Sequence, residues 1–197
     1  MTTLHRAVFL DRDGTIARDV HYCRRVEDFE ILPRVAEAIK LLNHEGYRVV
    51  IITNQSGVAR GYFTDETLSL IHQKMIEVLK DGGAHIDGVY ICPHHPDDKC
   101  ECRKPKPTLI VKAAVDIGIA LDQSYMIGDD PKDVEAGKAA GCRTILLTGS
   151  AAGQPQDING ICDHVAVDLY EAVGWLLQDA AERSSARIPI MKSRQEP

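Results

Sequence analysis

The chain has 197 residues, of which 44% are hydrophobic, and this is enough to bury the core of one domain without disulfide bonds. The net charge of −6 and the scattered basic residues argue against a broad nucleic-acid-binding surface. No apolar run approaches the roughly 20 residues of a membrane-spanning helix, and the first residues show no signal-peptide pattern. We therefore expect a cytoplasmic protein, by default a monomer, that binds neither a membrane nor nucleic acid.

The predicted elements alternate between strand and helix along most of the chain. Buried-strand patterns occupy residues 7–10, 48–52, 88–91, 125–127, 144–147 and 164–167. Helical patterns occupy residues 33–45, 64–81, 107–117 and 131–140 and the segment after Asp168. The alternation predicts an α/β fold with a parallel sheet and helices on both faces. Because crossovers between parallel strands are right-handed, the carboxyl ends of the strands should lie along one rim.

The first predicted strand ends at two carboxylates, Asp11 and Asp13, which Gly14 follows. Side chains two residues apart in an extended backbone point to the same side, so both carboxylates would face one reacting centre. One aspartate could then attack a substrate while the other transfers a proton. Taken alone, the motif has a second explanation, which is an Asp-rich turn with local hydrogen bonds.

Polar residues also stand at the ends of later strands. Thr53 follows the second strand, Asp129 follows the fourth, and a basic pair that ends at Lys104 precedes the helix at 107–117. Mg²⁺ takes oxygen ligands, commonly one or two carboxylates plus substrate phosphate. The predicted ligands are therefore Asp11, Asp129 and the backbone carbonyl of Asp13. The cation and Lys104 would offset the charge of a phosphate group during attack by a carboxylate.

Through these motifs the chain resembles the haloacid-dehalogenase (HAD) superfamily of phosphatases, over about residues 7–148. The resemblance implies a Rossmann-like HAD fold, here without an obvious large cap. It implies that Asp11 is the nucleophile that forms an aspartyl-phosphate. Asp13 would protonate the leaving alkoxide and then activate water. Thr53 and Lys104 would hold the transferring phosphoryl group, and Asp129 would complete the magnesium site.

Each motif residue also has an ordinary explanation when it is taken singly. Thr53 could cap a turn, Lys104 could be a solvated surface charge, and Asp129 could belong to a common Gly-Asp turn. Their order and their shared position at strand ends favour the catalytic interpretation. Asp133, one helical turn after Asp129, could support the metal site indirectly.

A cluster of cysteine and histidine residues lies between the third strand and Lys104. Cys92, Cys100 and Cys102, with one imidazole, satisfy a closed tetrahedral zinc site, which would be structural. By composition either His94 or His95 could be the fourth ligand, and the family resemblance selects His94. Free or redox-active cysteines are the alternative. The zinc loop, residues 92–102, would hold the following basic pair rigidly at the rim.

Two small groups of HAD phosphatases share this loop: the heptose-bisphosphate phosphatases and the histidinol-phosphate phosphatases. The string at 53–61 resembles the heptose group, whereas the short interval between Cys92 and Cys100 is closer to the histidinol-phosphate group. The heptose resemblance implies these substrate contacts: Arg12, Asp19, Val20, His21, Tyr22, Asn54, Gln55, Ser56, Arg103 and Asp130. Arg103 would bind the retained phosphate. Asp130 is a departure, because heptose enzymes often carry a lysine there, and an anion would weaken the hold on a bisphosphate.

The hypothesis from the sequence is an Mg²⁺-dependent phosphomonoesterase that acts on a small phosphorylated metabolite. The expected substrate is the 7-phosphate of a heptose 1,7-bisphosphate, in the synthesis of nucleotide-activated heptose for lipopolysaccharide. Histidinol phosphate is the alternative substrate, and a zinc-stabilised binding module without turnover is the alternative class. Residues 1–183 are predicted to form one domain, and the polar residues 184–197 a flexible tail.

Overall fold

The computed structural model describes residues 4–149 and 160–186. In chain order, its strands and α-helices are β1 (Ala7–Leu10), α1 (Val35–His44), β2 (Arg48–Asn54), α2 (Asp65–Asp81), β3 (Gly88–Cys92), α3 (Thr108–Ile117), β4 (Tyr125–Gly128), α4 (Pro131–Ala140), β5 (Arg143–Leu147), β6 (His164–Ala166) and α5 (Leu169–Ala186). Short 3-10 helices occur at η1 (Val26–Asp28), η2 (Pro96–Asp98) and η3 (Leu121–Gln123). The predicted alternation of strands and helices is confirmed.

The six strands form one parallel sheet in the order β3-β2-β1-β4-β5-β6. β1 lies between β2 and β4, and Leu10 pairs with Ile51 on one side and with Ile127 on the other. The order reverses direction at β1, which is where open α/β sheets bind their ligands. The residues that follow β1, β2 and β4 therefore meet at the carboxyl edge of the sheet.

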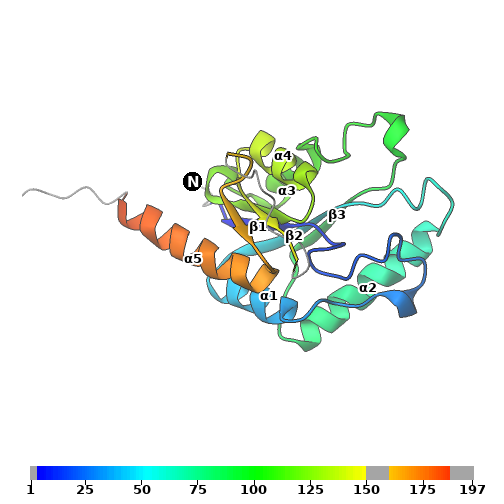
Figure 1. Cartoon of the computed structure of the whole chain (residues 1–197), viewed down its shortest axis with the longest axis horizontal. Coiled ribbons are helices and arrows are strands. Elements are labelled where there is room, and N and C mark those ends of the chain that lie inside the picture. Colours follow the sequence, from blue (N-terminus) through cyan, green and yellow to red (C-terminus); the bar gives the residue numbers. More distant parts are fainter. Residues whose placement is uncertain (1–3, 150–159, 187–197) are drawn as a thin grey trace, which may run out of the picture.

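Helices cover both faces of the sheet (Figure 1). On one face, Val8 and Leu10 of β1 belong to a core that includes residues of α1, α2 and α5. On the other face, Ala7 and Phe9 belong to a core that includes residues of α3 and α4. The alternation along β1 follows from the two-residue period of a strand whose two faces are both buried.

Two helix ends show the capping chemistry that their sequences predict. The Thr64 side chain accepts a hydrogen bond of 3.2 Å from the Thr67 amide at the start of α2. Before α5, Asp168 accepts a hydrogen bond of 2.8 Å from the Glu171 amide, and the Glu171 carboxylate accepts one of 2.8 Å from the Val167 amide. α5 continues to Ala186, past the predicted domain boundary at residue 183. Residues 187–197 lie outside the described part of the chain, so the flexible tail stays a prediction.

The connections that precede α1 and α2 contain little regular secondary structure. Within the described residues, they contain turns, isolated bridges and η1, and they form no separate cap domain. This agrees with the predicted fold. In the same described ranges, no helix is both long enough and apolar enough to cross a membrane.

Candidate active site

A polar cavity of about 190 Å³ lies at the carboxyl edge of the sheet. Its lining consists of Asp11, Asp13, Asp19, Thr53, Asn54, Arg103, Lys104, Asp129, Asp130, Lys132 and Asp133. They come from the segments after β1, β2 and β4 and from the segment before α3. The structure thus brings together the four predicted catalytic residues: Asp11, Asp13, Thr53 and Lys104.

Lys104 lines this cavity and is 3% exposed. Its Nζ atom is 2.8 Å from Asp11 Oδ1 and 2.6 Å from Asp133 Oδ1, and it donates to the Ile52 carbonyl at 2.8 Å. Burial alone would lower the pKa of this ammonium group, but the two carboxylates outweigh it and the net shift is upward. Lys104 is therefore a permanent positive charge beside Asp11.

The Asp11 carboxyl group is largely buried, unlike the carboxyl group of an ordinary surface aspartate. Burial raises its pKa to about 7, with a further upward contribution from Asp133, while Lys104 acts in the opposite direction. Two negative charges compete for one lysine at this point. A second cation would stabilise the ionised form of Asp11.

Three carboxylates gather where such a cation would bind. Oxygen atoms of Asp11, Asp129 and Asp133 lie within 4.8 Å of one another. Crowding by the cavity wall raises the pKa of Asp129 to about 6, again with a contribution from Asp133, although the Asp129 side chain is open to solvent on the cavity side. An all-oxygen set of this kind suits Mg²⁺. The sequence hypothesis gave Asp133 only a supporting role, and the structure places its carboxylate within the cluster.

Two glycines allow this cluster to form. A Cβ atom at Gly14 would overlap the Asp129 carboxylate, and one at Gly128 would overlap the Asp133 carboxylate. Gly14 also has a φ of +81°, a conformation that residues with a Cβ rarely adopt. The cradle around the carboxylates thus depends on the absence of side chains at both positions.

Asp13 is oriented by its neighbour Arg12. The Arg12 Nη2 atom lies 2.7 Å from Asp13 Oδ2 and 2.9 Å from Oδ1, and its Nε donates to Oδ1 at 3.1 Å. Gln55 Nε2 donates at 2.8 Å to Asp13 Oδ2 and also at 2.8 Å to the Thr53 hydroxyl. Arg12 is 1% exposed, and its side chain does not line the cavity. The guanidinium folds back onto the adjacent carboxylate, so the substrate contact of Arg12 stays a prediction that the cavity lining does not support.

Behind Arg12 lies His72, a residue of α2 that the sequence hypothesis did not include. Its Nε2 atom is 3.1 Å from Arg12 Nη1. Burial and then the charge of Arg12 lower the pKa of His72 to about 4. The sequence contains one signal that could have indicated His72. It shares the inward face of α2 with Leu68 and Met75, and a polar side chain on a buried face needs a hydrogen-bond partner.

Arg103 and Lys104 are held in place by a reciprocal contact with the end of β2. Asn54 Oδ1 accepts a hydrogen bond of 3.1 Å from the Lys104 amide, and Asn54 Nδ2 donates to the Lys104 carbonyl at 3.3 Å. Arg103 lines the cavity, and within the described part of the chain its buried Nη1 atom has no hydrogen-bond partner. A guanidinium with an unused donor suits an anionic ligand group.

The predicted substrate contacts divide into two sets. Four of them line the cavity: Asp19, Asn54, Arg103 and Asp130. Besides Arg12, five others do not line it: Val20, His21, Tyr22, Gln55 and Ser56. The Tyr22 ring instead packs edge-on against Tyr62 at 4.8 Å, which joins the loops after β1 and β2. Gln55 and Ser56 are buried, because the chain turns inward after Asn54.

Lys132 is a cavity residue that the sequence hypothesis missed. Its Nζ atom lies 3.0 Å from Asp130 Oδ2, and Asp130 also accepts from the Lys132 amide at 2.9 Å as the N-cap of α4. The anion at position 130 is therefore paired with a cation two residues later. The sequence hypothesis overlooked this pairing because it compared only the position directly after Asp129 with the family pattern, and the lysine lies two residues further on.

The predicted zinc ligands also come together. Cys100 Sγ lies 3.5 Å from Cys92 Sγ and 3.6 Å from Cys102 Sγ, and His94 Nδ1 lies 3.1 Å from Cys102 Sγ. In a tetrahedral zinc site with Zn–S bonds of about 2.3 Å, neighbouring sulfur atoms stand about 3.8 Å apart. His95 instead caps η2 through its Nδ1 atom. The donor set and its spacing fit Zn²⁺, with His94 rather than His95 in the cluster.

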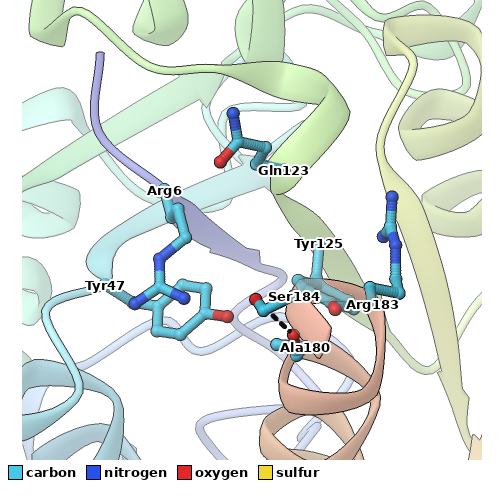
Figure 2. A pocket seen from close by; sticks show the side chains of 7 residues that line it. All are labelled: Arg6, Tyr47, Gln123, Tyr125, Ala180, Arg183 and Ser184. Carbon is cyan, nitrogen blue, oxygen red and sulfur yellow. Dashed lines mark hydrogen bonds between the residues drawn. The ribbon is translucent and has the colours of Figure 1, made fainter. Parts of the chain in front are cut away.

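A second, smaller cavity of about 50 Å³ lies at the amino ends of the strands (Figure 2). There the Arg6 guanidinium stacks on the Tyr47 ring at 4.4 Å, and Arg183 of α5 lines the opposite side. None of the described residues that line it is a carboxylate. The carboxyl-edge cavity, which is lined by six aspartates, is therefore the candidate active site.

Comparison with known proteins agrees with this geometry. A family model for HAD-hydrolase-like proteins matches residues 101–172. Together with the named relatives described next, this match places the chain among the HAD-like phosphatases, which are metal-using phosphoric monoester hydrolases.

Relatives of known name indicate which group of HAD-like phosphatases the chain resembles. D-glycero-beta-D-manno-heptose-1,7-bisphosphate 7-phosphatase of Yersinia pestis is 36% identical over 193 residues, 94% of this chain and 97% of the relative. The Helicobacter pylori enzyme of the same name is 44% identical over 144 residues, 73% of this chain and 83% of the relative. A crystal structure of D,D-heptose 1,7-bisphosphate phosphatase from B. bronchiseptica, complexed with magnesium and phosphate, is 35% identical with a TM-score of 0.78, and the match covers 88% of this chain and 99% of that one. The chain belongs to the heptose-bisphosphate phosphatase family.

Proposed function

We propose that the protein removes the 7-phosphate of a D-glycero-D-manno-heptose 1,7-bisphosphate in an Mg²⁺-dependent reaction through an aspartyl-phosphate. The observation that carries this proposal is the position of Asp11, which lies against Lys104 in the cavity beside Asp13. The names of the relatives support the substrate. The product would enter the synthesis of nucleotide-activated heptose for lipopolysaccharide.

The reaction would take place in two steps. In the first, an Asp11 oxygen bonds to phosphorus while the bond between phosphorus and the C7 oxygen breaks. The electron pair of that bond stays on the sugar oxygen, which takes a proton from Asp13. In the second step, Asp13 takes a proton from water, the water oxygen bonds to phosphorus, and the bond to Asp11 breaks. Thr53 and Lys104 would hold the phosphoryl oxygens throughout.

Two metal ions are part of the proposal. The carboxylates of Asp11, Asp129 and Asp133 fit Mg²⁺, and the backbone carbonyl of Asp13 would add an oxygen ligand. Bound Mg²⁺ supplies positive charge that reduces the repulsion between the substrate phosphate and the attacking carboxylate. Zn²⁺ would be structural, because the three cysteines and His94 close its coordination shell.

The unused donor of Arg103 favours a bisphosphate over histidinol phosphate. Arg103 lines the cavity, and its buried Nη1 atom has no hydrogen-bond partner among the described residues. The second phosphate group of a bisphosphate would accept this hydrogen bond, whereas histidinol phosphate has no second phosphate. Six of the lining residues are aspartates and three are cations, so this specific contact, and not the overall charge of the wall, carries the preference.

A substrate panel tests the proposal. We would measure phosphate release from heptose 1,7-bisphosphate and from histidinol phosphate, each with Mg²⁺ and with a chelator. The expected result is Mg²⁺-dependent release, with kcat/KM at least about 10-fold higher for the heptose bisphosphate. A preference for histidinol phosphate would reject the heptose assignment and keep the phosphatase chemistry.

A substitution at the nucleophile tests the mechanism. Asp11→Asn should lower the rate by at least about 1,000-fold, because the amide cannot form the acyl phosphate. Asp116→Asn is the matched control, since Asp116 is an α3 carboxylate outside the cavity lining that pairs with Lys112. Full activity of Asp11→Asn would refute the assignment of Asp11.

A further inference from the structure

The Arg12 guanidinium is a buried charge whose contacts point in two directions. On one side it donates to both oxygens of Asp13, and on the other its Nη1 atom contacts His72 Nε2 at 3.1 Å. At 1% exposure it cannot rely on water for its hydrogen bonds. Its position is therefore set by Asp13 on the cavity side and by His72 on the α2 side.

The direction of the contact with His72 follows from chemistry. A guanidinium can only donate hydrogen bonds, so His72 Nε2 must be the acceptor and the ring must be neutral. The burial of His72, at 7% exposure, agrees with a neutral ring, and so does its lowered pKa. His72 is thus a fixed acceptor on a helix rather than a mobile surface group.

The contacts around Asp13 determine its orientation. Among the residues that the structure describes, Oδ2 accepts from Arg12 and from Gln55, and Oδ1 accepts from Arg12 alone. Since Gln55 also donates to Thr53, one side of the carboxylate is tied to β2. Arg12 provides the remaining contacts, and only His72 ties Arg12 to a helix among the side-chain hydrogen bonds of the described residues.

We propose that His72 is a positioning residue for proton transfer, because it fixes Arg12 and Arg12 in turn fixes the Asp13 carboxylate at the leaving oxygen. This proposal rests on the proposed role of Asp13 as the acid. His72 touches neither the substrate nor the reacting atoms. Proton transfer is sensitive to small displacements of the acid, so a support outside the cavity can control it.

The leaving group distinguishes this role from general support of the fold. When the phosphorus–oxygen bond of an alkyl phosphate breaks, the alkoxide needs a proton from Asp13. The nitrophenolate of p-nitrophenyl phosphate is stable as an anion and leaves without one. Because kcat/KM covers the steps up to the loss of the leaving group, it isolates this proton transfer from the later hydrolysis of the aspartyl-phosphate.

Two variants in the full chain test the proposal. His72→Leu removes the acceptor and keeps an apolar side chain of moderate size, whereas His72→Gln retains an oxygen acceptor. For heptose 1,7-bisphosphate, His72→Leu should lower kcat/KM by about 10-fold or more. For p-nitrophenyl phosphate, kcat/KM should change less than about 3-fold, and His72→Gln should restore most of the loss.

Equal losses on both substrates, or no loss on either, would overturn the proposal. The p-nitrophenyl phosphate rate also reports whether His72→Leu is folded. If the wild-type protein does not hydrolyse the heptose bisphosphate, the proposed substrate fails but the comparison remains available. Any other primary alkyl phosphate that the wild-type protein hydrolyses then replaces it, and the same difference between the two leaving groups is expected.

Discussion

Gly14 lies directly against Asp129, so closely that a Cβ atom at Gly14 would occupy the space of the Asp129 carboxylate. The two residues come from the segments after β1 and β4, which are neighbouring strands. The absence of one side chain therefore sets the distance between the β1 turn and a proposed magnesium ligand.

We expect Gly14→Ala to weaken magnesium binding. The new methyl group would displace the Asp129 carboxylate and separate it from Asp11. The measurement is phosphatase activity against Mg²⁺ concentration, in which the half-saturating concentration should rise by about 10-fold or more.

Gly46→Ala is the control for Gly14→Ala. Gly46 has a φ of +78°, close to the +81° of Gly14, but a Cβ there would meet no atom within 4 Å. Both variants share a backbone penalty of roughly 1–2 kcal/mol for an L-residue in this conformation. If Gly46→Ala raises the magnesium requirement equally, backbone strain rather than the clash with Asp129 is the cause.

Lys132→Gln should raise KM for the bisphosphate by about 3-fold to 10-fold and leave kcat nearly unchanged. The charge of Lys132 neutralises Asp130 at the cavity lining, so its loss leaves an anion that faces the substrate. Lys112→Gln, on α3 and outside the lining, is the comparison variant. An unchanged KM in Lys132→Gln would show that the substrate does not contact this wall.

Cys100→Ser should remove the bound zinc and destabilise the protein. Loss of one of four ligands opens the coordination shell, and metal-binding free energy contributes directly to folding. Metal analysis of the purified chain should fall from one zinc to none, and Tm should fall by roughly 5–10 °C. Cys162→Ser changes a cysteine outside the cluster and should keep both values. A zinc content of one in Cys100→Ser would contradict the assignment.

Stability should depend on His72 between pH 6.5 and about pH 4. In the unfolded chain His72 takes up a proton below its ordinary pKa of 6.5, whereas in the fold burial lowers the pKa to about 4. The unfolded state therefore binds more protons in this window, and stability falls as the pH falls. The contribution is at most about 3 kcal/mol.

The measurement is the free energy of unfolding of the wild-type protein and of His72→Gln at several pH values. Glutamine does not titrate, so the difference between the two proteins isolates His72 from the cavity carboxylates, whose raised pKa values act in the opposite direction. The wild-type protein should lose stability relative to His72→Gln on acidification. Parallel curves would mean that His72 takes up a proton as readily in the fold as in the unfolded chain, and they would contradict the buried neutral ring.

The sheet and the strand-end residues could be predicted because they depend on local patterns. A buried parallel strand is an apolar run, and a strand that ends at Asp11 or Asp129 places its carboxylate at the rim in any sheet of this type. The residues of the proposed zinc site were equally visible, since they lie within a short segment. The topology of a parallel sheet then brings the strand-end residues together at one edge, and no further information from the sequence is needed.

The supports of the site could not be predicted in the same way. Alternation along a strand would direct Arg12 away from Asp13, but the turn at Gly14 lets its long side chain return to the adjacent carboxylate. His72 is 60 positions from Arg12, and only the packing of α2 beneath the β1 loop joins them. The pairing of Lys132 with Asp130 could be predicted only from the position at which α4 begins, because Asp130 is the N-cap of that helix.

The central place of β1 has a consequence for how such a chain can diverge. Its two neighbours, β2 and β4, lead to Thr53 and Asp129, and β3 leads through the cysteine-rich loop to Lys104, whereas β5 and β6 lead to none of the proposed catalytic groups. Mutations in β5 and β6 can therefore accumulate with effects on folding alone. The four adjacent strands from β3 to β4 are the part that we expect to be inherited together, because changes there would lower the turnover rate.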